Sequence, residues 1–112
     1  MASDLGYHGE AIEELNRLLN ARSKKTRLAC AYTIGKLTRL PGRKGSQLKQ
    51  LKTAREGLYA ISEVSLPGRE VVLFFSALEQ ESGLCFKILH AKEVIGETQY
   101  QAEYPVAEAR RE

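Results

Sequence analysis

The spacing of apolar residues changes at Pro41-Gly42, and this change limits the folds open to the chain more than any other feature. Before it, apolar residues recur every three or four positions, which predicts one helix over about residues 3–20 and a second that ends at Leu40. Ser23 is placed to cap the second helix. The second helix is signalled by Leu28, Ala31, Tyr32, Ile34, Gly35 and Leu37. We therefore expect an antiparallel helical hairpin over about residues 3–40.

After the change, short segments of alternating and β-branched residues predict strands over about 47–92. They fall within 47–52 and 58–64, and most clearly over 70–77, which we place centrally in the sheet. A turn at Leu66-Pro67-Gly68 precedes this strand, and residues 84–91 pair with it as a hairpin. These segments predict an α+β fold in which the helical hairpin packs on an antiparallel sheet of three to four strands.

The polar and acidic tail over about 96–112 predicts a short C-terminal helix or a loose end, because Pro105 disfavours one long helix. With 112 residues, the chain has the size of one domain, and we assign residues 1–112 to it. The sequence contains neither a long apolar stretch nor the layout of a secretory signal, which favours a cytoplasmic protein without membrane contact.

The cysteines and histidines indicate no cofactor. Cys30 and Cys85 lie in apolar stretches, where a thiol behaves as a small hydrophobe. His8 and His90 are solitary, and no glycine-rich phosphate loop occurs. We therefore expect neither a metal nor a small-molecule cofactor.

The charges are distributed unevenly along the chain. All fourteen carboxylates lie outside a window that holds twelve basic residues: Arg17, Arg22, Lys24, Lys25, Arg27, Lys36, Arg39, Arg43, Lys44, Lys49, Lys52 and Arg55. A block of one sign attracts phosphate-rich partners such as RNA. The alternative is a solvated helical surface that the acidic C-terminal half neutralises in space.

Four segments then resemble a known family in order and spacing over roughly residues 7–100. They are YHGEAIEEL (7–15), LKQLK (48–52) followed by GLYAI (57–61), REVVLFF (69–75) and ILHAK (88–92). The chain resembles the RelE/ParE superfamily of toxins from type II toxin-antitoxin systems, in particular the phage-derived HigB-like branch. The resemblance implies a RelE-like fold, with a helical hairpin against a twisted antiparallel sheet.

The resemblance also implies an activity, which is metal-independent cleavage of mRNA on the ribosome, neutralised by a cognate antitoxin. Such an endoribonuclease needs cations that stabilise charge on the phosphate while the ribose hydroxyl attacks. On the matching positions, the resemblance implies Arg69, His90 and Lys52 as catalytic residues. It implies RNA binding by Lys49, Lys52, Arg55, Lys92 and Tyr100, with a base stacked on Tyr100.

The chain departs from the family pattern in three places, and two of these departures, Ser62 and Glu93, favour a rival function. Ser62 stands where the family commonly has arginine, Glu93 replaces a second basic residue, and no opening strand is recognisable before Tyr7. The rival is a catalytically inactive binding module on the same fold, or a phage-encoded regulator, that binds a host protein or a nucleic acid. In that case the basic hairpin, with Lys24, Lys25 and Arg27, carries the contact.

Structural roles remain open for several of these residues. Lys49, Lys52 and Arg69 are also typical of solvated strand faces. His90 is either a structural histidine or an acid–base group. The aromatic residues of the apolar strands are expected in the core: Tyr59, Phe74, Phe75 and Phe86.

Overall fold

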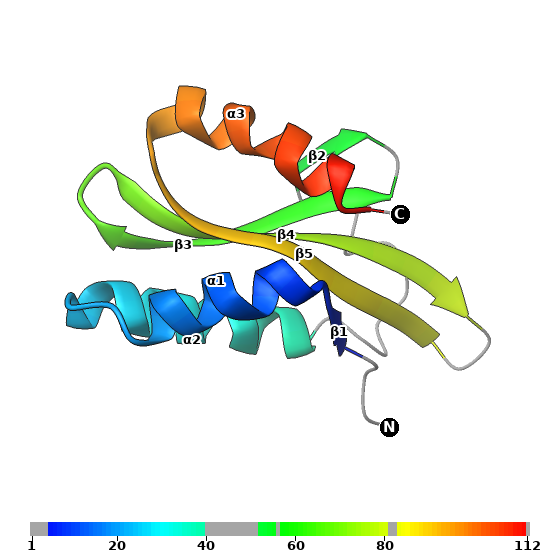
Figure 1. Ribbon diagram of the computed structural model, residues 1–112, viewed down its shortest axis with the longest axis horizontal. Helices are drawn as coiled ribbons and strands as arrows, with labels where there is room; N and C mark the ends of the chain where they lie inside the picture. Colours follow the sequence, from blue (N-terminus) through cyan, green and yellow to red (C-terminus); the bar gives the residue numbers. More distant parts are fainter. Residues whose placement is uncertain (1–4, 40–51, 56, 81–82, 112) are drawn as a thin grey trace.

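The computed structural model describes residues 5–39, 52–55, 57–80 and 83–111, with the side chains of 52–55, 78–80 and 83–84 left out of the description. The elements are β1 (Leu5–Tyr7), α1 (Gly9–Leu19), α2 (Lys24–Arg39), β2 (Lys52–Arg55), β3 (Leu58–Leu66), β4 (Arg69–Gln80), β5 (Gly83–Ile95) and α3 (Gly96–Ala109). Helices α1 and α2 cover one face of the sheet and α3 covers the other (Figure 1). The α+β class predicted from the sequence is confirmed.

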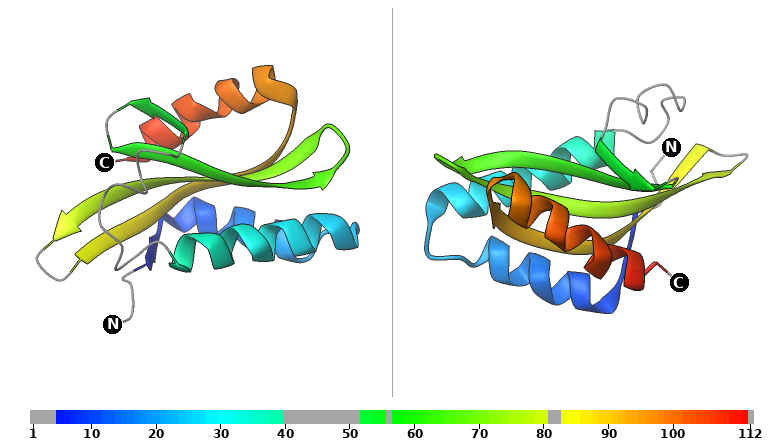
Figure 2. Two further views of the ribbon diagram at one scale, coloured as in Figure 1. Left: turned by 180° about the vertical axis from the view of Figure 1, so that it is seen from behind. Right: turned by 90° about the horizontal axis from the view of Figure 1, so that it is seen from above.

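The described strands form one mixed sheet of five strands in the order β1-β5-β4-β3-β2, so the prediction of an antiparallel sheet of three to four strands was wrong. Strand β4 is central and pairs antiparallel with β3 and β5, as the sequence predicted. Gly68, with φ of 78°, lies in the turn between β3 and β4, where a residue without Cβ adopts the left-handed region freely. Figure 2 shows the twist of the sheet and the oblique crossing of α3 above it.

The prediction that the first helix begins at about residue 3 was wrong, because the strand β1 precedes α1. Residues Leu5–Tyr7 form a short strand that pairs in parallel with β5, with Leu5 opposite Phe86. The pairing continues through His8, whose N–H donates to the Ile88 carbonyl at 2.8 Å. A strand of three residues has too little alternation to be distinguished from the helix that follows it, and its partner lies about eighty residues away.

The helical hairpin itself is confirmed, with α1 and α2 side by side beneath the sheet (Figure 1). Ser23 caps α2, since its Oγ accepts a hydrogen bond from the Thr26 N–H at 3.3 Å. The buried face of α2 differs from the expected one, because it includes Thr33 while Tyr32 is exposed. The Thr33 hydroxyl donates to carbonyls of its own helix, Cys30 at 2.7 Å among them, which allows this polar side chain to be buried.

Alternation along β4 divides the core between the two faces of the sheet. Val71, Leu73 and Phe75 point to the helical hairpin, whereas Val72 and Phe74 point to α3. We call these sides the hairpin face and the α3 face. An irregularity in β5 places His90 opposite Phe74 and Ile88 opposite Phe75, so that Leu89 is an extra residue on this strand.

The C-terminal tail is more ordered than the sequence predicted. One helix of 14 residues, α3, runs through Pro105. Tyr100, Tyr104 and Ala107 are buried against the α3 face, with the Tyr104 ring 5.0 Å from that of Phe74. Pro105 is exposed and removes one backbone hydrogen bond. The burial of two tyrosines on the sheet outweighs that loss.

Candidate functional site

His90 lies at the centre of a charged cluster on β5, where that strand extends past β1. Its side chain is enclosed, with 3% of the residue exposed. Nδ1 lies 3.0 Å from Oε1 of Glu14 on α1, and Nε2 lies 2.6 Å from Oε1 of Glu103 on α3. The ring also stacks on Phe74 at 5.5 Å. His90 therefore connects the sheet to a helix on each side.

Both ring nitrogens of His90 are occupied by these contacts. Nδ1 also lies 3.3 Å from Nη1 of Arg110, but its contacts with the two Glu14 oxygens are shorter, at 3.0 and 3.1 Å. An ionised carboxylate only accepts hydrogen bonds, so a ring nitrogen that carries a hydrogen donates it to Glu14 or to Glu103. Acid–base chemistry on RNA would require this arrangement to open.

Arg110, directly after α3, completes the cluster. Its Nη1 donates to Oε1 of Glu14 at 2.8 Å and to the carbonyl of Leu89 at 3.1 Å, while its Nε pairs with Glu10 at 3.0 Å. The hydrogen bond from Arg110 to Glu14 raises the pKa of the guanidinium further above its already high ordinary value. The cluster therefore ties the end of α3 to α1.

Glu14 accepts hydrogen bonds from three directions. Besides Arg110 and His90, the backbone N–H of Ala91 donates to its Oε1 at 3.1 Å, which satisfies a donor on the open edge of β5. Burial alone would raise the pKa of Glu14, but the hydrogen bonds from Arg110, Ala91 and His90 together outweigh it and hold the pKa below its ordinary value of 4.5. Glu14 thus remains an anion that serves the fold.

Tyr100 is enclosed as well, with 1% of the residue exposed. Its ring meets Phe74 edge-on at 5.9 Å, and burial raises the pKa of its hydroxyl above the ordinary value. A nucleobase cannot reach either face of this ring while α3 is packed on the sheet. The stacking role that the resemblance implies is therefore not available to Tyr100 in this conformation.

The predicted catalytic residues are not brought together. Arg69 is opposite Leu66, whereas Lys52 is opposite Ala60 further along β3. Six residues of strand, at about 3.3 Å each, separate these positions by about 20 Å. Lys52 lies in the same row as His90, three strand spacings or about 14 Å away, and α3 packs over the row between them.

The remaining predicted residues are dispersed. Lys92 is exposed and lies opposite Val72, on the α3 face. The side chains of Lys52 and Arg55 and the whole of Lys49 lie outside the described part of the chain. Within the described part of the chain, the residues that the resemblance implied therefore do not line one concave surface.

Glu93 has a structural explanation. It lies on the hairpin face, where its Oε2 accepts hydrogen bonds from Thr26 at 3.0 Å and from Ser65 at 2.5 Å. Both hydroxyl-bearing residues are buried. The carboxylate accepts from both hydroxyls and so joins α2 to β3 and β5.

The exposed side of α2 is positively charged. This helix contains no acidic residue. Lys24, Lys25 and Arg39 are exposed and form no ion pair with another described residue. Lys36 is neutralised by Glu63, and Arg27 donates to the carbonyl of Ala21 in the loop between α1 and α2 at 2.6 Å.

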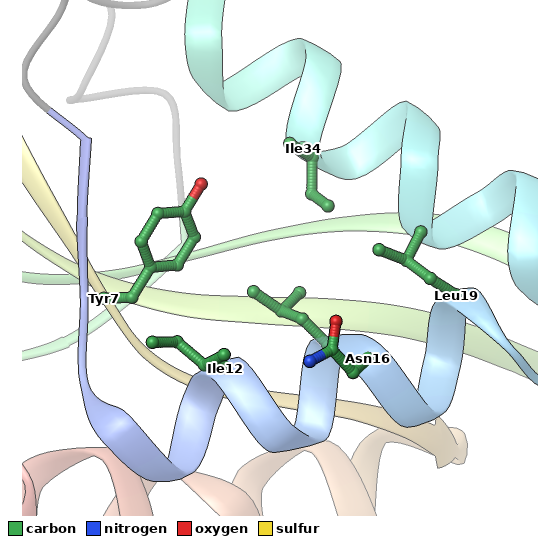
Figure 3. Close-up of a pocket in the computed structure, with 6 residues that line it drawn as sticks. Tyr7, Ile12, Asn16, Leu19 and Ile34 are labelled. Carbon is green, nitrogen blue, oxygen red and sulfur yellow. The ribbon is translucent and has the colours of Figure 1, made fainter.

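An apolar groove lies between β1, α1 and α2. Tyr7 leans into it from β1 and Ile34 points into it from α2, with Ile12, Asn16 and Leu19 on the opposite wall (Figure 3). The groove has a volume of about 320 Å³, and none of the described residues that line it is charged. These residues therefore do not supply the groups that acid–base or phosphoryl-transfer chemistry needs.

Comparison with protein-family models, curated proteins and solved structures finds no significant match. None of the described helices is long and apolar enough to cross a membrane. Within the described ranges, no group of three or more His, Cys, Asp or Glu side chains is arranged to hold a metal ion.

Proposed function

We propose that the chain is a RelE-like module that binds RNA through the exposed cations of its helical hairpin and does not cleave it. The observation that carries this proposal is the contrast between two sets of residues. Lys24, Lys25 and Arg39 are exposed on an acid-free helix, whereas His90 and Tyr100 are enclosed in the core.

Exposed cations suit a phosphate backbone. Each phosphate that a lysine or arginine neutralises releases counterions from the nucleic acid, which gives affinity that falls steeply with salt. Cations already paired with carboxylates, such as Lys36 and Arg110, contribute little to such binding. Lys24, Lys25 and Arg39, which form no ion pair with a described residue, are therefore the candidates for RNA contacts on α2.

The test is binding of a labelled single-stranded RNA over a range of salt concentrations, followed by fluorescence anisotropy. Lys24→Ala together with Lys25→Ala should reduce the slope of log affinity against log salt by about 1 to 2. The matched control replaces Arg69 and Lys92, which are exposed cations on the sheet. The RNA is recovered at the end and should be intact.

Two results would contradict this proposal. One is the absence of salt-dependent binding by the wild-type chain. The other is binding that survives the change at Lys24 and Lys25 but is lost in the Arg69 and Lys92 control, which would move the contact to the sheet.

A second candidate is the toxin itself, an mRNA endoribonuclease that acts on the ribosome and is neutralised by an antitoxin. One observation favours it: β1 precedes α1 and pairs with β5, so the opening strand that the resemblance implies is present. Discrete cleavage of mRNA on translating ribosomes, weakened by Lys52→Ala and Arg69→Ala, would support this function. Intact transcripts under all conditions would exclude it.

A further inference from the structure

Tyr32 is an exposed aromatic residue in the middle of the acid-free helix α2. The residue is 59% exposed, although it belongs to the apolar spacing from which the sequence predicted the helix and its buried face. It borders a shallow groove of about 390 Å³ between α2 and the end of β3. Leu28, Val64 and Pro67 contribute apolar surface to this groove, and Val64 is 67% exposed.

Cations lie on both sides of this ring along the helix. Lys25 is seven residues before Tyr32 and Arg39 is seven residues after it, and seven residues make almost two turns. Both cations therefore lie on the same side of α2 as the ring, each about 10 Å away along the axis. Lys25 also lines the groove.

The described residues that line the groove carry no unpaired negative charge. Glu63, the carboxylate among them, forms an ion pair with Lys36, which also donates to the carbonyl of Ser62 at 3.0 Å. The surface thus combines an aromatic face, apolar walls and flanking cations. This combination suits a base that stacks and a backbone that carries phosphates.

We infer that this groove binds single-stranded RNA, with a base stacked on Tyr32 and neighbouring phosphates held by Lys25 and Arg39. This inference rests on the proposed function and specifies that the helical hairpin binds single-stranded rather than duplex RNA. In a duplex, neighbouring base pairs stack on one another and cover the faces of the bases. Only an unpaired base can therefore stack on an exposed tyrosine. Binding to the backbone alone would not distinguish single strands from duplexes.

The experiment compares a labelled single-stranded RNA, an abasic strand of the same length and the corresponding duplex. Tyr32→Ala should weaken binding of the single strand by about 5- to 150-fold, which is the range of one base–aromatic stack. Tyr32→Phe keeps the ring and should retain most of the affinity. Tyr7→Ala is the matched control, since Tyr7 is an exposed tyrosine in a different groove.

The abasic strand separates stacking from charge. Wild-type protein should bind it as weakly as Tyr32→Ala binds the normal strand, and Tyr32→Ala should not weaken abasic or duplex binding further. Circular dichroism and thermal unfolding of each variant show whether the fold is retained, which we expect because Tyr32 is largely exposed.

The results distinguish the two proposals. If the wild-type chain binds no RNA at low salt, both the proposed function and this site are wrong. If binding depends on Lys24 and Lys25 but is unchanged in Tyr32→Ala, RNA binding stands and this site is wrong. Equal affinity for single strand, abasic strand and an acidic peptide would likewise overturn the stacking site.

Discussion

Nε2 of His90 lies 2.6 Å from Oε1 of Glu103, and this contact joins the last strand to the C-terminal helix. Both side chains are largely buried. Since Nδ1 of the same ring faces Glu14 on α1, one imidazole connects the two layers of helices through the sheet. The stability of α3 on the sheet should therefore depend on this pair.

Removing the Glu103 carboxylate should destabilise the fold. We expect Glu103→Ala to lower the free energy of unfolding by about 3 kcal/mol, because Nε2 of His90 would lose its partner in a buried setting. Glu103→Gln should cost less, since the amide oxygen still accepts a hydrogen bond. Urea denaturation measures both, with Glu13→Gln as an exposed control on α1. A Glu103→Ala variant as stable as the control would contradict the structural role of this contact.

The low pKa of Glu14 predicts how stability changes with acid. The folded chain holds this carboxyl as an anion more strongly than the unfolded chain, so its contribution is complete above the ordinary value of 4.5 and is lost as the pH falls through the lower folded pKa. The difference in unfolding free energy between wild type and Glu14→Gln should shrink over that window. In the wild-type chain, His90, Arg110 and the Ala91 N–H face the Glu14 carboxylate. A difference that stays constant with pH would refute this assignment.

The two cysteines should differ in reactivity. Burial raises the pKa of the Cys30 thiol to about 11, so at pH 8 only about one molecule in a thousand carries the thiolate. Cys85 is half-buried. In single-cysteine variants, a thiol reagent should modify Cys85 under native conditions and Cys30 only when denaturant unfolds the chain. Rapid native labelling of the Cys85→Ser variant would show that Cys30 is more accessible than its burial indicates.

Replacing Pro105 should stabilise α3. Proline in a helix interior costs up to about 3 kcal/mol relative to alanine, and Pro105→Ala restores an N–H that can donate to the Gln101 carbonyl. Proline also restricts the unfolded chain, which offsets part of the gain. We expect a net increase of about 1–2 kcal/mol in unfolding free energy and a higher Tm. A lower Tm would show that the proline ring itself stabilises the packing of α3.

Local patterns predicted much of the fold. The helical hairpin, the cap at Ser23, the central position of β4 and its hairpin with β5 all follow from periodicity and from neighbours in sequence. The strand β1 and the full length of α3 did not follow, because each is stabilised mainly by contacts with distant parts of the chain. The sequence also did not predict that Tyr32 is exposed, since the apolar spacing on α2 does not show that the neighbouring Thr33 is the buried residue.

The same distinction between sequence and tertiary structure applies to the candidate sites. The sequence by itself determined the acid-free run of cations and its place on the helical hairpin, because charge order is a property of the chain. Only the tertiary structure decided that His90 is enclosed by Glu14 and Glu103, 76 and 13 positions away, and that Tyr100 packs against Phe74. Burial and hydrogen-bond partners depend on which elements meet in space, and a linear pattern does not contain that information.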